Sequence, residues 1–412
     1  MKKSNETKGS QAGLWLILLV TIAVQALATF TTLSLAAIAP DVASGLSVSP
    51  ELVGFQVSLI YFGGAVMSTV AGFQLRRWGP VRVSQASLMF CAVGAGLAVI
   101  PSLATVAAGS IVIGFGYGMT NPAASELLLR IMPAGRRNLI FSIKQTGVPI
   151  GGVLAGLTAP PISQSFGWQW APAVAAISCF MLALLIQPLR TAWDADRDPT
   201  ARFKERPFDA LSIVWRSPPL RWLSVSGFFY AAVQLSLATF VVTLLVTDAG
   251  FGLIEAGAVL AIVQAAGVVG RVAWGWIADR LGHGLIVLLI IGGACVTGAL
   301  LVMAVSETWS TFAILILFTL FGINALGWTG VFQVEAARYA PQGKLGTVIG
   351  GVTAPTYGGV IVGPAVFSLA FVAIGSYTTT FALVALFAVL GMLSVALASR
   401  AAARNPSVSA QF

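Results

Sequence analysis

The sequence predicts an all-α integral membrane protein of twelve transmembrane helices in two pseudo-symmetric six-helix bundles. Three observations predict this class: an extreme hydropathy, the regular spacing of long apolar runs, and a repeat that relates the two halves of the chain. Of the 412 residues, 57% are hydrophobic and only 9% are charged, and the mean hydropathy is +0.91. A soluble domain carries about 25% charged residues, so most of this surface must face something other than water.

Each apolar run is long enough to cross a bilayer, which takes about 20 residues of helix. In the first half of the chain we expect spans at 14–39, 52–74, 83–101, 104–128, 138–162 and 171–188. In the second half we expect them at 222–246, 254–278, 284–305, 310–333, 345–371 and 378–399. Pro, Gly or charged residues stand in nearly every gap, as is typical of chain turns.

The charges of the loops predict the topology. Apart from two residues inside spans, Lys and Arg, which give the chain its net charge of +9, lie in alternate loops and at the termini, whereas the charged residues of the other loops are only the acids Asp41, Glu51, Asp248, Glu255 and Glu307. Cytoplasmic loops are enriched in Lys and Arg, so both termini are expected in the cytoplasm and the number of spans is expected to be even. The basic balance therefore indicates a multi-pass protein of the cytoplasmic (bacterial inner) membrane and no nucleic-acid partner.

The longest hydrophilic stretch, residues 190–221, mixes both charge signs and predicts a solvated cytoplasmic linker. It separates an N-terminal six-helix bundle (1–189) from a C-terminal one (222–412). A repeat supports this division, because an offset of 203 residues relates Gly72–Gly79 to Gly275–Gly282. The same offset relates Gly147 to Gly350 and Gly156 to Gly359. Repeated halves around a midplane site are typical of transporters.

The segment Gly275-Trp-Ile-Ala-Asp279-Arg280-Leu-Gly282 resembles the G-x-L-A-D-R-x-G loop signature of the major facilitator superfamily. The resemblance covers essentially the whole chain and implies a carrier that works by alternating access. In the first-half copy, Arg76 stands where the family has Asp, which places a gating salt bridge there in doubt. The residues to which the resemblance assigns a gating role are Gly72, Gly79, Arg82, Gly275, Asp279, Arg280 and Gly282. The alternative is that both loops are only structural turns.

Two cations lie inside predicted spans, Lys144 in the fifth and Arg271 in the eighth. An ionisable residue within a span is costly and indicates function. Arg271 resembles the span-eight arginine that contacts the substrate carboxylate in monocarboxylate and oxalate/formate facilitators, and a guanidinium fork suits a carboxylate. Gln264 lies on the same helical face, with Gly267 between them leaving room for a ligand. The alternative is that both cations extend to the cytoplasm or pair with an acid at a span end, Glu126, Glu335 or Asp279.

Further candidates for solute contact are polar and aromatic residues of spans one, four, seven and ten, which line the cavity in the resembled fold. They are Gln25, Tyr117, Asn121, Tyr230, Gln234, Asn324 and Trp328. Polar side chains also join helices to one another, so a purely structural role is the alternative for each. No carboxylate falls near a predicted midplane, which argues against a dedicated proton relay.

Other classes of protein find little support in the sequence. It contains no H-E-x-x-H, Walker A or Cys/His metal motif, so we expect neither an enzyme nor a cofactor or metal. We predict a secondary-active transporter, of symporter type and functional as a monomer, whose partners are the bilayer and a small solute. Uptake of an organic anion such as a carboxylate is the first hypothesis. Export of amphipathic or drug-like compounds is the alternative, and the motifs of drug:proton antiporters are broken here, with Ser110 in the span-four arginine position.

Overall fold

The structure, a computed structural model, describes residues 2–131, 140, 143–200, 207–341 and 345–404, and these residues form helices and turns without a β-strand. Eleven helical segments of the described residues are long and apolar enough to cross a membrane. The all-α membrane class is therefore confirmed. The helix α8 (Gly147–Phe166) belongs to the predicted fifth span and is not among the eleven. Part of that predicted span, 138–139 and 141–142, lies outside the described residues.

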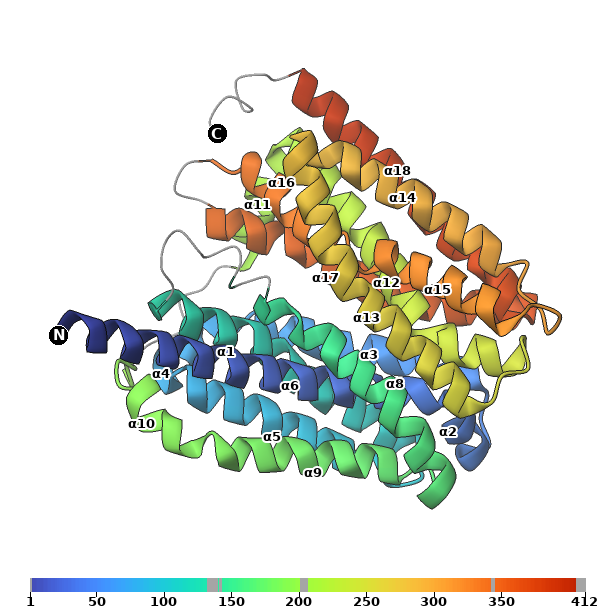
Figure 1. Ribbon diagram of the computed structural model, residues 1–412, viewed down its shortest axis with the longest axis horizontal. Coiled ribbons are helices and arrows are strands. Elements are labelled where there is room, and N and C mark those ends of the chain that lie inside the picture. The colour runs from blue at the N-terminus through green and yellow to red at the C-terminus, as the bar shows by residue number, and fades with distance from the viewer. Residues whose placement is uncertain (1, 132–139, 141–142, 201–206, 342–344, 405–412) are drawn as a thin grey trace. The chain divides into compact units, whose positions relative to one another are not determined.

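Chain contacts divide the protein into two compact units. Unit 1 comprises residues 1–35 and 59–205. Its helices are α1 (Lys2–Ser34), the second part of α3 (Val53–Ser68), α4 (Ala71–Trp78), α5 (Pro80–Ala98), α6 (Leu103–Ile131), α8, α9 (Trp170–Leu185) and α10 (Arg190–Trp193). Within unit 1, α5 packs on α6 and α9, and α1 packs on α6, α8 and α9 (Figure 1).

Unit 2 comprises residues 36–58 and 206–412. After the short helices η1 (Ala36–Ile38), α2 (Ala39–Leu46) and η2 (Pro50–Leu52), it contains α11 (Pro207–Arg216), α12 (Pro218–Thr247), α13 (Leu253–Leu281), α14 (Gly284–Val302), α15 (Thr311–Ala325), α16 (Thr329–Arg338), α17 (Leu345–Ile374) and α18 (Tyr377–Ala403). The helix α12 is its core, because it packs on α13, α17 and α18 and 83% of its apolar window is buried.

Several predicted spans are interrupted, and two of these breaks lie inside the span rather than near its end. The second span breaks between α3 and α4 at residues 69–70, and the tenth breaks between α15 and α16 at residues 326–328. Proline usually breaks a helix, but here it does not: Pro122 lies inside α6, and both Pro355 and Pro364 lie inside α17. Neighbouring helices can satisfy backbone groups in a membrane protein, so tertiary packing rather than local preference decides where these helices break.

The repeat has matching local geometry in the two units. Gly79 and Gly282, 203 residues apart, both have positive φ angles, +86° and +68°, and each turns the chain into the next helix, α5 or α14. A non-glycine residue is strained there. The fifth-span helix also packs on α1 through glycine, and the eleventh-span helix packs on α12 in the same way. A side chain at Gly151 would meet the Ala26 carbonyl, and one at Gly359 would meet the Phe228 carbonyl.

Candidate functional site

Lys144, the predicted intramembrane cation of unit 1, lies in the helical turn that precedes α8. Lys144 is only 1% exposed, and its ammonium group donates a hydrogen bond to the side-chain oxygen of Asn121 on α6. Asn121 itself is exposed. The partner is a neutral amide, so the contact satisfies one donor of the ammonium group without cancelling its charge.

Glutamine side chains extend this contact into a polar cluster. The Gln25 amide on α1 donates to the Gln145 side-chain oxygen at 3.5 Å, directly beside Lys144. The Gln25 oxygen is buried without a hydrogen-bond partner among the described residues. On α6, Tyr117 stands one turn before Asn121 and packs edge-to-face on Tyr61 with ring centroids 5.2 Å apart. The structure therefore brings the unit 1 candidates together from α1, α6 and the turn before α8.

The cation of unit 2, Arg271, is partly exposed on α13. Its Nε–H donates to the Leu326 carbonyl at 3.1 Å, in the break between α15 and α16. The break frees this carbonyl from an ordinary helical bond, and the guanidinium is held by it. The space expected beside Gly267 is not open, because the Leu326 side chain packs there. Gln264, one helical turn before Gly267, is 4% exposed.

The remaining candidates of unit 2 form contacts between helices. The Trp328 indole N–H donates to the Gln234 oxygen of α12 at 3.0 Å, and its ring packs edge-to-face on Tyr230 at 5.7 Å. The Tyr230 hydroxyl donates to the Leu288 carbonyl of α14 at 2.8 Å. Both aromatic residues are 2% exposed. Asn324 donates to the Leu320 carbonyl one turn earlier at 2.7 Å, and its own side-chain oxygen is buried without a described partner.

The two loop motifs differ in what surrounds them. Asp279 is exposed, and Arg280 lies over the Trp276 ring, 4.5 Å from its centroid. Gly275 has open space around it, so no close approach of a neighbouring helix requires glycine at this position. In the first-half motif, Gly72 and the Arg82 side chain are partly buried.

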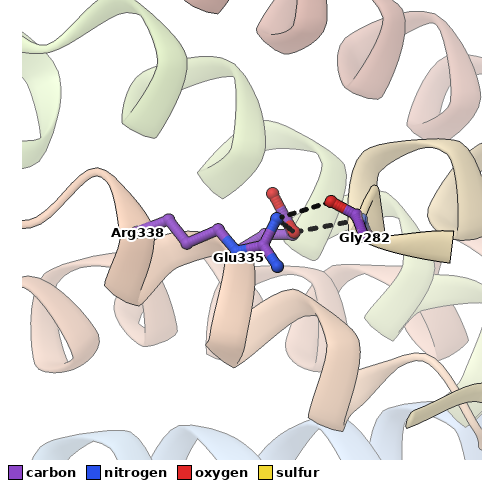
Figure 2. Close-up of polar contacts among 4 residues, drawn as sticks. Gly282, Glu335 and Arg338 are labelled. Carbon is purple, nitrogen blue, oxygen red and sulfur yellow. Dashed lines mark hydrogen bonds and ion pairs between the residues drawn. The ribbon is translucent and has the colours of Figure 1, made fainter. Parts of the chain in front are cut away.

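Two acids that the sequence did not single out as sites hold these loops. Glu335 of α16 accepts the Gly284 N–H at 3.1 Å and pairs with Arg338 at 3.0 Å, while Arg338 donates to the Gly282 carbonyl (Figure 2). In unit 1, the Asp194 carboxylate accepts the backbone N–H groups that begin α5. Carboxylates stabilise helix N-termini. The sequence offers Glu335 only as a partner for the cations and Asp194 only as part of a solvated linker, because each is remote in sequence from the helix that it caps.

The geometry is that of a membrane protein with buried polar groups in each unit, and comparison with known proteins supplies its family. The family model described as Major Facilitator Superfamily matches residues 18–354. This chain belongs to the Major Facilitator Superfamily. The resemblance of the loop signature is thereby confirmed, and the protein is a membrane transporter rather than an enzyme.

Relatives within the superfamily cover most of the chain. An uncharacterized MFS-type transporter of Mycobacterium tuberculosis is 22% identical over 90% of this chain and 82% of its own length. The gentisate transporter of Corynebacterium glutamicum is 25% identical over 77% of this chain and 72% of its own. Among solved structures, a peptide transporter in complex with sulfate aligns with a TM-score of 0.73 at 15% identity, covering 96% of this chain and 95% of that one. This last likeness supports the superfamily's fold.

Proposed function

We propose that this protein is a secondary-active transporter that moves a small organic anion, such as a carboxylate, across the cytoplasmic membrane by alternating access. In this proposal twelve spans form two six-helix halves, residues 1–189 and 222–412, joined by a linker, with both termini in the cytoplasm. The observation that carries the anion is Arg271, a cation inside the membrane-spanning helix α13, held by a backbone carbonyl at a helix break.

The orientation of the Arg271 guanidinium supports a carboxylate cargo. Because its Nε–H is bonded to the Leu326 carbonyl at 3.1 Å, the orientation of the group is restricted. A planar guanidinium offers donors in a rigid fork that matches the two oxygens of a carboxylate. Fixing that fork before the solute arrives lowers the entropy lost on binding.

Charge balance in unit 1 supports the same class of solute. Lys144 is bound by a neutral amide, and a cation in a low-dielectric interior gains most from an anion that comes close. Asn121 is the exposed member of the pair and Lys144 the buried one. We therefore assign direct solute contact to Asn121 and long-range attraction to Lys144. The similarity to a gentisate transporter supports an organic anion as the class of solute.

Substitution of Arg271 tests the proposal. We expect Arg271→Ala to abolish uptake of the transported acid into proteoliposomes while leaving membrane insertion and detergent solubility unchanged. Arg271→Lys should also lose most transport, because an ammonium group keeps the charge but not the fork. The substrate is first found by a thermal-shift screen of the purified protein against organic acids, bases and neutral solutes.

The outcomes of this experiment separate the alternatives. Full transport in Arg271→Ala would remove the argument for an anion, and full transport in Arg271→Lys would assign Arg271 a structural role at the helix break. Stabilisation by cationic amphiphiles instead of acids in the screen would favour an exporter of amphipathic compounds.

A further inference from the structure

Unit 1 contains a second cationic feature, which is separate from the residues assigned to transport. A pocket of about 510 Å³ opens at the corner where α4 turns into α5. Four arginines and a tryptophan line it, together with two small apolar residues: Arg77, Trp78, Arg82, Arg190 and Arg197. Ligand pockets of proteins typically measure about 300–1,000 Å³, so this one is large enough for a molecule rather than for a few waters.

The pocket exists because the chain after α9 folds back onto α5. Asp194 is 4% exposed, and its two carboxylate oxygens accept the N–H groups of Val81 at 2.8 Å and Arg82 at 3.0 Å. A few residues later, the Asp198 N–H donates to the Arg76 carbonyl at 2.8 Å. These bonds fix the segment that carries Arg190 and Arg197 beside the one that carries Arg77 and Arg82.

The positive charge of the pocket is not neutralised by its own lining, which contains no carboxylate. Asp194 keeps its negative charge beside the pocket, and both of its oxygens accept hydrogen bonds from the start of α5. The Asp198 carboxylate accepts hydrogen bonds from the Thr200 hydroxyl at 2.6 Å and from the Thr200 N–H at 2.9 Å. These bonds hold the pKa of the Asp198 carboxyl below its usual value. The Arg190 Nε–H is buried without a hydrogen-bond partner among the described residues.

We propose that this pocket binds a phosphate group, carried either by an anionic lipid or by a small soluble phosphate compound. Arginine forks match phosphate oxygens as they match carboxylates, and basic pockets at the ends of membrane helices suit lipid headgroups. Trp78, 40% exposed, supplies an aromatic wall of the kind found at the membrane interface. The site is independent of the solute that the protein transports.

The experiment uses the full-length protein in detergent and two kinds of probe. One is mixed micelles that contain phosphatidylglycerol, compared with phosphatidylcholine, and the other is inorganic phosphate or glycerol phosphate. Binding is followed by microscale thermophoresis, and the change in tryptophan fluorescence is measured in parallel. The protein contains 11 tryptophans, so the part of the signal that arises in the pocket is identified by its loss in Trp78→Phe.

The test variants are the double substitution Arg77→Gln with Arg190→Gln and the single substitution Arg197→Gln. The matched control is Arg216→Gln, which removes the same charge from an exposed position outside the pocket. None of these changes touches Asp194, so the cap of α5 is retained. We expect the double variant to bind about tenfold more weakly or worse, Arg197→Gln to bind more weakly than wild type, and the control to bind as wild type does.

The two probes distinguish the sources of the phosphate. Tight binding of phosphatidylglycerol with weak binding of the soluble phosphates supports a lipid site, and competition between the two supports a site for the phosphate group itself. Equal affinities of wild type, control and both pocket variants for every probe would overturn the proposal. So would phosphatidylcholine binding as tightly as phosphatidylglycerol.

Discussion

Lys144 combines nearly complete burial with a neutral hydrogen-bond partner, which lets its structural and functional roles be separated. We expect Lys144→Met to keep or raise thermal stability, because replacing a buried charge by an apolar side chain of similar volume is often neutral or stabilising. Transport of an anion should fall by about tenfold or more, since an attraction of about 1.4 kcal/mol is lost. Thermal unfolding in detergent and uptake by proteoliposomes measure the two effects.

Substitution of Asn121, the hydrogen-bond partner of Lys144, should have the opposite effect on stability. Asn121→Leu leaves the ammonium group without its acceptor, and we expect a loss of about 1–3 kcal/mol in stability. If Lys144→Met were the more destabilised of the two variants, the lysine would be a structural residue. Its proposed effect on the solute would then have to be abandoned.

At the scale of single helices, α17 offers a matched pair of glycines. A side chain at Gly359 would collide with the Phe228 backbone carbonyl of α12, whereas Gly350 has open space around it. Gly359→Ala should therefore lower stability by about 1–3 kcal/mol through overpacking. Gly350→Ala should be neutral or stabilising by up to about 1 kcal/mol, because Ala favours the helix. Melting temperatures in one detergent compare them directly, and equal shifts would show that α12 and α17 are not in close contact.

The helices themselves were predictable in position but not in continuity. Long apolar runs between turn residues located most of them, for example 284–305 for α14 (Gly284–Val302) and 378–399 for α18 (Tyr377–Ala403). The breaks were not predictable. Gly327 is a weak local sign of an end at residues 326–328, but glycines also lie inside many of the predicted spans. The contacts found at the break, the bond from Arg271 to the Leu326 carbonyl and the packing of Leu326 at Gly267, join residues remote in sequence.

At the scale of the whole molecule, the proposed topology is testable with thiol chemistry. The native cysteines Cys91, Cys179 and Cys295 are all buried, so a new exposed cysteine is measured against a low background. In intact cells, a membrane-impermeant maleimide should label Thr308→Cys, which lies in a predicted outer loop. Thr200→Cys, in the predicted cytoplasmic linker, should react only after permeabilisation. The reverse pattern would invert the orientation, and labelling of both in intact cells would invalidate the assay.

The candidate site was predictable only as a list of residue types. Hydropathy and charge identified Lys144 and Arg271, because cations within apolar runs are conspicuous. Partners remote in sequence were not identifiable: Asn121 is 23 residues from Lys144, and the acceptor of Arg271 is a backbone carbonyl 55 residues away. Every residue has a main-chain oxygen, so the sequence does not show which one accepts a hydrogen bond. For the same reason the role of Asp194 could not be predicted, because its hydrogen-bond donors are main-chain N–H groups that lie 112 and 113 residues earlier.

The cap that Asp194 places on α5 determines where the chain can be cut if its two halves are to be expressed as separate fragments. Hydropathy alone suggests cutting after residue 189, where the sixth apolar run ends. A first fragment that stopped there would lack the carboxylate for the Val81 and Arg82 amides, and two of the four arginines around the corner. A split that preserves the folding of the N-terminal part has to fall beyond Thr200, within what looks from composition like a dispensable spacer.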